Sequence, residues 1–179
     1  MSTTYDDLRK KFNTHIDKEN DEEREASEIL WRVIECCRKN HGVPTDGLKC
    51  HPPSDEVQQT GGDFNPLFGL RKMPSGVWTL DLALQIGDRN LHQSWVVAAI
   101  RPEIRFDDND IELTFKGDSP KFHFGDKLED QERVIAEYAE IAMQNFGKAI
   151  QREGLRRAIG FHAAPQIASA IPKYPSPLP

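Results

Sequence analysis

The chain has 179 residues, of which 37% are hydrophobic and 29% are charged, and its net charge is −6. This length suits one domain with its own core and is short for two. The acidic balance argues against general duplex binding, because non-specific affinity for nucleic acid comes mainly from Lys and Arg side chains on phosphates. No apolar run approaches the roughly 20 residues that span a bilayer, and the first residues lack the pattern of a secretory signal. We therefore expect a soluble cytoplasmic protein.

Residues 1–41 are predicted to form a helical N-terminal segment. Thr4, followed closely by two acidic residues, is typical of a capped helix start. The apolar side chains of the first turns fall on one helical stripe: Tyr5, Leu8, Phe12 and Ile16. The nearly all-charged run 17–25 predicts a break or kink, after which a second apolar stripe begins. Gly42 is expected to end the second helix.

Residues 42–76 contain six Gly and five Pro and are predicted to be a long loop. A connection of this length is uncommon in a compact domain, so it is either functional or partly structured. The stretch 67–73 could add an edge strand before a turn at 74–76.

The segment 77–125 predicts an antiparallel meander of four to five strands. Apolar residues alternate with polar ones in two runs: Trp78, Leu80, Leu82, Leu84 and Ile86, then Ile111, Leu113 and Phe115. The polar turns at 87–90 and 107–110 are short enough to join antiparallel neighbours. Residues 95–100 are apolar without alternation, which indicates burial on both faces.

A second long helix is predicted over residues 126–153, because one broad apolar stripe runs through it and Gly154 follows as a stop. Residues 154–179 are expected to form a mobile tail, with a short helix possible from Pro165. The whole chain is then a single α+β domain, a two-layer sandwich with the N-terminal and C-terminal helices on one face of the sheet. The other face is left for water, a ligand or a partner.

One candidate metal set is Cys37, His41, Cys50 and His51, since thiolates and imidazoles are the usual ligands of tetrahedral zinc. Their spacing matches none of the common zinc patterns, and Gly42 could end the helix before His41 shares its face with Cys37. We expect Cys37 to be a small buried hydrophobe instead. No metal and no cofactor are predicted.

A second candidate set lies on the sheet: Asp81, Glu103, Arg105, Glu112 and Lys116. This order of elements resembles the core of restriction-endonuclease-like nucleases: a helix, then a meander that bears an Asp and a Glu-x-basic triplet, then a further helix. That resemblance implies that Asp81 and Glu103 would hold a divalent metal, with Arg105 where such nucleases have lysine. The alternative is that these charges are the solvent-facing half of amphipathic strands, in which case Asp81→Asn and Glu103→Gln leave folding intact.

His123 is a third candidate, because Asp126 follows it closely and a His–carboxylate pair orients many catalytic groups. The alternative is a surface histidine beside an Asp that caps the next helix. No candidate outweighs its structural alternative, so we expect a non-enzymatic accessory protein. It would bind another protein, or a second copy, through the exposed sheet face and the loop 42–76. The alternative function is a metal-dependent hydrolase or nuclease that uses Asp81, Glu103 and neighbouring basic residues. In that alternative the catalytic residues are Asp81, Glu103, Arg105 and His123.

Overall fold

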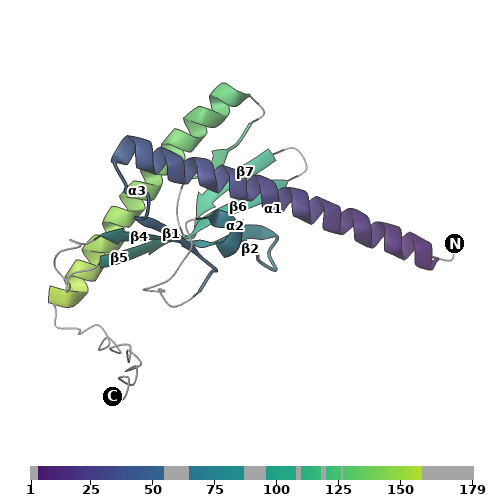
Figure 1. The fold of residues 1–179 in the computed structure, drawn as a ribbon, viewed down its shortest axis with the longest axis horizontal. Coiled ribbons are helices and arrows are strands. Elements are labelled where there is room, and N and C mark those ends of the chain that lie inside the picture. Colours follow the sequence, from purple (N-terminus) through teal and green to yellow (C-terminus); the bar gives the residue numbers. More distant parts are fainter. Residues whose placement is uncertain are drawn as a thin grey trace, which may run out of the picture.

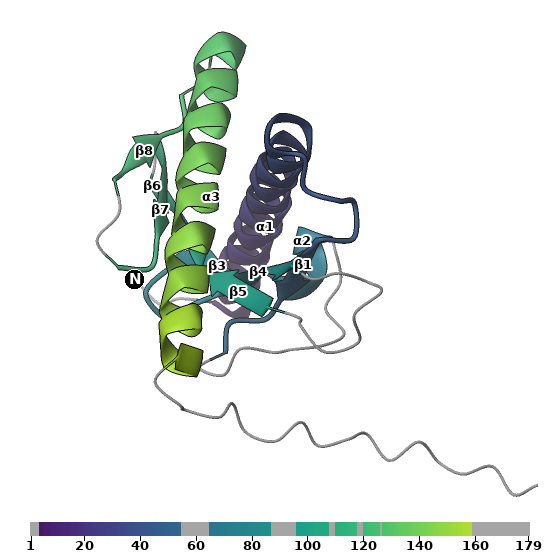
Figure 2. The ribbon, with the colours of Figure 1, turned by 90° about the vertical axis from the view of Figure 1, so that its left-hand side faces the viewer.

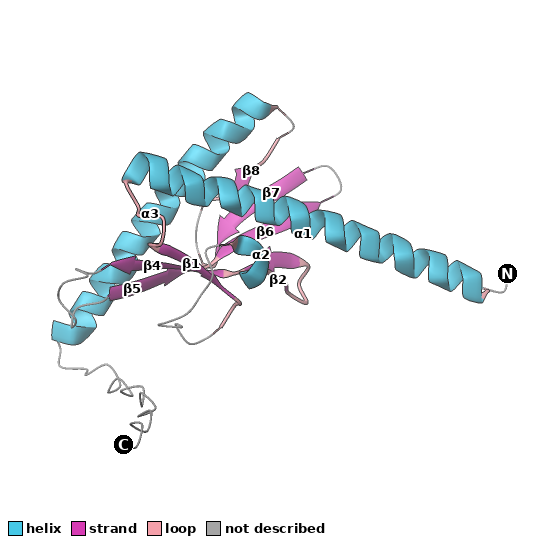
Figure 3. Cartoon of the chain, viewed as in Figure 1, coloured by secondary structure: helices cyan, strands magenta, loops and turns pink. Residues whose placement is uncertain are grey.

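The computed structural model of the protein describes residues 4–54, 65–86, 96–107, 110–117, 120–125 and 127–158. It is an α+β fold in which two long helices cover antiparallel strands (Figures 1 and 3), as the sequence predicts. The elements in chain order are α1 (Tyr5–His41), β1 (Leu48–His51), α2 (Pro66–Gly69), β2 (Arg71–Lys72), β3 (Val77–Thr79), β4 (Asp81–Ile86), β5 (Val96–Ile100), β6 (Pro102–Asp107), β7 (Asp110–Phe115), β8 (Phe122–His123) and α3 (Leu128–Ala158).

The predicted meander is present, but its first hairpin is bent. Strand β4 pairs with β1 and β5 in a three-stranded sheet, whereas β3 and β6 pair within a five-stranded sheet of order β2-β3-β6-β7-β8. Thr79 faces Glu103 and Leu82 faces Ile100, so both halves of the hairpin keep one register. That register would place Leu80 opposite Pro102, which has no backbone N–H to donate. The carbonyl of Pro102 accepts a hydrogen bond from the Thr79 hydroxyl at 2.7 Å. The ladder of backbone hydrogen bonds between the two strands is interrupted at this position.

Helix α1 is continuous from Tyr5 to His41, so the predicted break within 17–25 is wrong. The charged run contains neither Gly nor Pro, and its side chains pair along the helix, as in the 2.9 Å contact of Arg24 with Asp21. Such pairs support a polar helix segment. Both predicted ends are confirmed, with a capping box at Thr4 and a left-handed Gly42 at φ 66°.

Helix α3 passes through Gly154 and continues to Ala158, so the predicted stop is also wrong. A single glycine inside a helix costs only about 1 kcal/mol relative to alanine and need not end it. The first five residues of the predicted tail 154–179 thus belong to α3. The rest of that tail, including the short helix at Pro165, lies outside the described residues, as does Asp126.

The segment 42–76 holds three short elements, where the sequence predicts mostly loop. Strand β1 pairs with β4. Of the predicted edge strand 67–73, only β2 (Arg71–Lys72) pairs with β3, and Pro66–Gly69 forms the helix α2 instead. Asn65 caps α2 by accepting a hydrogen bond from the backbone of Leu67 at 3.1 Å. The segment therefore extends both sheets with an edge strand.

The core lies between the two helices and the inner face of the strands (Figure 2). The buried face of the five-stranded sheet carries one row across its strands, Trp78, Ile104, Leu113 and Phe122. Tyr138 of α3 is fully buried, stacks on Phe115 at 4.3 Å between ring centroids, and donates its hydroxyl to the carbonyl of Thr114 at 2.5 Å. Five of the alternating apolar residues are buried there, Leu80, Leu82, Leu84, Leu113 and Phe115, whereas Ile86 at the end of β4 is 43% exposed.

Candidate functional site

The N-terminal half of α1 projects beyond the sheets and α3 (Figure 1) and carries an exposed apolar stripe. The exposed fractions of its four residues are 78% for Tyr5, 57% for Leu8, 63% for Phe12 and 36% for Ile16. Spacings of three and four residues put these side chains on one face of the helix. We call this set the projecting stripe.

Local interactions support the helix that presents the stripe. Thr4 and Asp7 form a reciprocal cap: the backbone N–H of Asp7 donates to the Thr4 hydroxyl at 3.3 Å, and the backbone N–H of Thr4 donates to the Asp7 carboxylate at 3.0 Å. Hydrogen bonds from the Thr4 side chain and backbone lower the pKa of Asp7. The cap satisfies backbone donors that would otherwise be free at the first turn.

An ionic cluster fixes α1 to the strands at the base of the projecting half. The Lys72 ammonium lies 3.1 Å from the carboxylate of Glu19 and 2.9 Å from that of Glu22, and the Trp78 indole donates to Glu22 at 3.0 Å. Burial disfavours the charged forms of both Glu22 and Lys72. The hydrogen bonds nevertheless lower the pKa of Glu22 and raise that of Lys72. We call Glu19, Glu22, Lys72 and Trp78 the anchor cluster.

The projecting stripe continues the face of α1 that packs into the core. Beyond Ile16, residues at the same spacing are Glu19 and Glu22 of the anchor cluster. They are followed by Ala26, Leu30 and Val33, all of which are buried. One side of a single helix is thus covered by the body of the protein in its C-terminal half and uncovered in its N-terminal half. Exposed apolar faces of this kind are typical of surfaces that bind another molecule.

Charge is distributed unevenly along the same helix. Arg9, Lys10 and Lys11 are consecutive cations in the projecting half, whereas residues 17–25 carry six acids and two bases. A partner lying along α1 would therefore meet a positive segment followed by a negative one.

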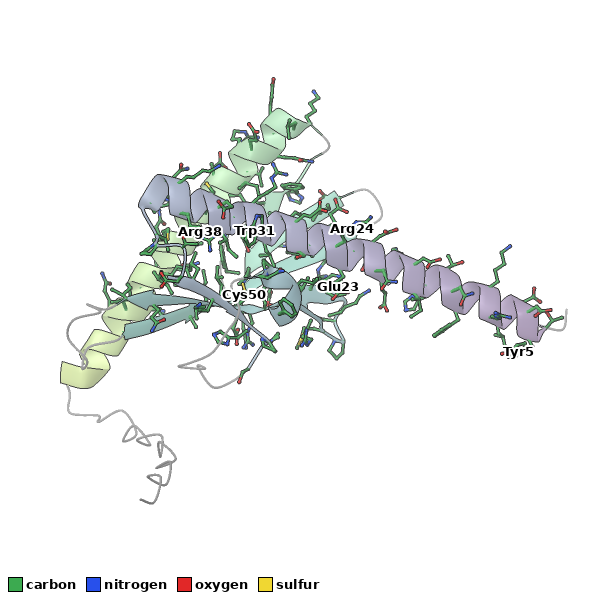
Figure 4. All side chains as sticks on the ribbon, in the orientation of Figure 1. Tyr5, Glu23, Arg24, Trp31, Arg38 and Cys50 are labelled. Carbon is green, nitrogen blue, oxygen red and sulfur yellow. The ribbon has the colours of Figure 1, made fainter. Side chains whose placement is uncertain are left out.

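A pocket of about 460 Å³ lies where α1 joins the body, lined by Ser27, Glu28, Trp31, Arg32 and Asn65. Trp31 is 38% exposed, and the Arg38 guanidinium lies 5.6 Å from the centre of its ring. Figure 4 shows Trp31 and Tyr5 on the same helix, Trp31 over the body and Tyr5 at the far end. The sequence analysis missed this pocket, because its walls come from α1 and from Asn65, far apart in the chain.

The structure places Asp81 in an ion pair and not in an open carboxylate cluster. Arg101 approaches both carboxylate oxygens, at 2.6 and 3.0 Å, and also donates to the carbonyl of Ser54, whose N–H donates to Asp81 at 2.8 Å. Both side chains are mostly shielded, with 14% of Asp81 and 15% of Arg101 exposed. The expectation that Asp81 faces solvent is therefore wrong, and the effect of Asp81→Asn on folding stays a prediction.

Glu103 and Arg105 lie on β6, on the face of the five-stranded sheet away from the helices. Glu103 faces Thr79 and Thr114, and the exposed Arg105 faces Glu112, which accepts from Lys121 at 2.8 Å. The expected arrangement of charge on the outer half of these strands is thus present. Whether these residues take part in hydrolysis stays a prediction.

His123 pairs with a different carboxylate from the one predicted. Its Nδ1 lies 2.5 Å from Asp110 of β7, and both side chains are substantially exposed. Strands β7 and β8 lie side by side and bring Asp110 to His123. Asp126, the partner that the sequence suggests, lies outside the described residues.

The four potential zinc ligands are divided among separate contacts. Cys37 is buried in α1, and burial raises the pKa of its thiol to about 12. His41 lies 3.5 Å from Glu140 of α3, while Cys50 and His51 are buried in β1. Among the described residues, no three His, Cys, Asp or Glu side chains come together in a way that could hold a metal ion.

Comparison with known proteins assigns no relationship: no protein family, no curated protein and no solved structure matches this chain. Within the described part of the chain, no helix combines the length and apolar character that a membrane crossing requires. The projecting stripe is the surface feature on which a function can best be argued.

Proposed function

We propose that this protein is a non-enzymatic accessory protein that binds another protein chain through the projecting stripe of α1. The observation that supports this most is the exposure of four large apolar side chains on one face of a capped helix. Burying a Leu or Phe side chain completely is worth roughly 1.5–3 kcal/mol, so a partner that covers the stripe gains a substantial driving force. An amphipathic helix laid against a partner is a recurrent mode of protein recognition.

The outer face of the five-stranded sheet and the segment 42–76 remain a second proposed surface. The described part of that face carries charged pairs, Glu112 with Lys121 and His123 with Asp110. The segment 42–76 exposes three large apolar side chains, those of Leu67, Phe68 and Met73. Rim charges of this kind affect specificity and association rate more than affinity. The stripe is assigned the main energetic role, because its four large apolar side chains lie on one face of a single helix.

A photo-cross-linking experiment in the native host tests the proposal. Phe12 is replaced by benzoylphenylalanine, which keeps an aromatic ring in the stripe, and Arg105 is replaced by the same residue as a matched exposed control on β6. We expect a cross-linked protein adduct from position 12 that is lost when Leu8→Ser is added. Adducts of equal yield from both positions, or none from position 12, would contradict the proposal.

A further inference from the structure

The projecting half of α1 follows the seven-residue repeat of paired helices, whose positions are written a to g and whose apolar seam runs through a and d. Tyr5 and Phe12 occupy position a and Leu8 occupies position d, with His15 at the next d and Ile16 at e. The four apolar side chains are exposed. The stripe from Tyr5 to Ile16 is about 18 Å long at 1.5 Å per residue, which is roughly three helical turns.

The same seam continues under the body of the protein. Glu19 and Glu22 occupy the next a and d positions, and the Lys72 ammonium lies 3.1 Å and 2.9 Å from their carboxylates. Ala26 and Val33 follow at position a and are buried. The body therefore covers the seam from Glu19 onward and ends before the projecting half (Figure 1). A flat membrane would meet the body before it lay along the stripe, whereas a slender element such as a helix can lie there.

The charged residues that flank the exposed seam all have one sign. In paired helices the side chains at e and g border the seam and meet those of the partner. Among residues 4–18, the charged residues at e and g are all basic: Arg9, Lys11 and Lys18. The acids of this segment are at b, c and f, away from the seam: Asp6, Asp7 and Asp17. Lys18 also contacts Glu22 within α1, at 4.0 Å.

Arg9 and Lys11 lie next to the stripe and are exposed. Arg9 follows Tyr5 by four residues and precedes Phe12 by three, and Lys11 follows Leu8 by three, spacings at which side chains on a helix are neighbours. A partner helix with carboxylates at its own e and g positions would place opposite charges beside these cations. A second copy of α1 would place like charges there, which disfavours self-pairing.

We infer that the partner of the projecting stripe is an acidic amphipathic helix of another protein, about three turns long, with carboxylates on both sides of its apolar seam. This inference rests on the proposed function, because it names the chemistry of the partner at the same surface. Leu8 and Phe12 pack into the seam of that helix, and Arg9 and Lys11 pair with its flanking Asp or Glu residues. The contact ends at Glu19, where the body begins to cover α1.

Binding of designed peptides to the purified full chain tests the inference by fluorescence anisotropy. Two labelled peptides of about three heptads share Leu at a and d and differ only at e and g, where one has Glu and the other has Lys. We expect the Glu peptide to bind more tightly than the Lys peptide by roughly tenfold or more at low salt, and the preference to shrink as salt is raised. Equal affinities, tighter binding of the Lys peptide, or no binding of the Glu peptide would overturn the inference.

Two adjacent cations of α1 provide a matched pair of variants. Arg9→Glu, at position e, should weaken binding of the Glu peptide by about fivefold. Lys10→Glu makes the same change in net charge at position f, on the far side of the helix, and should alter the affinity by less than about twofold. Both residues are exposed, so far-UV circular dichroism should stay unchanged. Equal effects of the two substitutions would show attraction to net charge alone and overturn the inference.

Other occupants of the stripe would give different results. We expect sedimentation velocity to show that the chain alone is a monomer. A dimer that Phe12→Ser abolishes overturns the inference in favour of a second copy. A chain that binds phosphatidylserine vesicles but not the Glu peptide overturns it in favour of a membrane surface.

The two proposals can fail separately. A cross-link from position 12 to a host protein, together with equal affinities for the two peptides, leaves the proposed function intact and removes only the acidic helix as its partner. Absence of any adduct from position 12 removes the proposed function itself.

Discussion

Individual side chains show how far a residue type predicts its role. Asp81 was expected to be a replaceable surface charge, because it occupies a polar position in an alternating strand. The structure places its carboxylate against Arg101 and the N–H of Ser54, with little solvent contact. Which polar strand residues are shielded depends on the segments that lie over them, and these come from elsewhere in the chain.

The shielding of Asp81 leads to a stability prediction. Asp81→Asn is expected to lower the free energy of unfolding by about 1–3 kcal/mol, because it leaves the mostly shielded Arg101 without its carboxylate partner. Glu103→Gln, a matched change on β6, should alter it by no more than about 0.5 kcal/mol. Urea unfolding at neutral pH measures both, and equal effects of the two substitutions would argue against a special role for the Asp81–Arg101 pair.

The anchor cluster should make stability depend on pH in two windows. Lys72→Met is expected to cost about 1 kcal/mol at neutral pH, a small value because solvent still screens the pair. The lowered pKa of Glu22 means that its contribution is present above the ordinary value of 4.5 and is lost as pH falls through the folded-state pKa. The raised pKa of Lys72 means that its contribution is present below 10.5 and is lost as pH rises through the folded-state pKa.

Thermal or urea unfolding of wild type and Lys72→Met across these pH values measures the difference. We expect a plateau between the two windows and a smaller difference at either extreme. A difference that stays constant into strong acid would mean that Lys72 stabilises the protein through its aliphatic stem over Trp78 and not through its charge.

At the scale of elements, α1 is one helix with two environments. Its buried residues begin at Ala26, whereas residues 5–18 are all exposed. An isolated helix of that length is marginal in water, so the projecting half depends on its cap and on continuity with the buried half. The elements that carry stability and those that carry the proposed interaction are thus consecutive parts of one helix.

Deletion of residues 1–18 should consequently leave the body folded. We expect the free energy of unfolding of the monomer to fall by less than about 1 kcal/mol, because the described residues that are removed, 4–18, are all exposed. Circular dichroism should show a loss of helix with little change in the unfolding midpoint. A large loss of stability at concentrations where the chain is monomeric would show that the projecting half supports the core.

For the whole molecule, both helices and both sheets share one hydrophobic cluster. Leu30 of α1 is buried in this cluster, as are Leu82 of the three-stranded sheet and Ile104 of the five-stranded sheet. A shared core of this kind should unfold as one cooperative unit.

Leu30→Ala is expected to lower the free energy of unfolding by about 2–5 kcal/mol, the usual cost of emptying a large side chain from a core. Far-UV circular dichroism and tryptophan fluorescence should report the same shifted midpoint. Leu8→Ala, in the projecting stripe, provides a matched control with little expected effect on the monomer. Separate midpoints for the two probes would indicate that the sheets unfold independently.

The sequence alone determined the α+β class, both ends of α1 and the order of the antiparallel strands. These depend on local periodicity, caps and short turns, which act between residues close in the chain. It did not determine the continuity of α1, because the pattern of 17–25 allows either a solvated helix or a break, and contacts with Lys72 and Trp78 accompany the helix. The bend at Pro102, the partner of His123 and the shielding of Asp81 likewise depend on residues far away in sequence. Only the tertiary structure showed that the stripe Tyr5, Leu8, Phe12 and Ile16 is uncovered, because an apolar helical stripe has the same pattern whether the body of the protein packs against it or ends before reaching it.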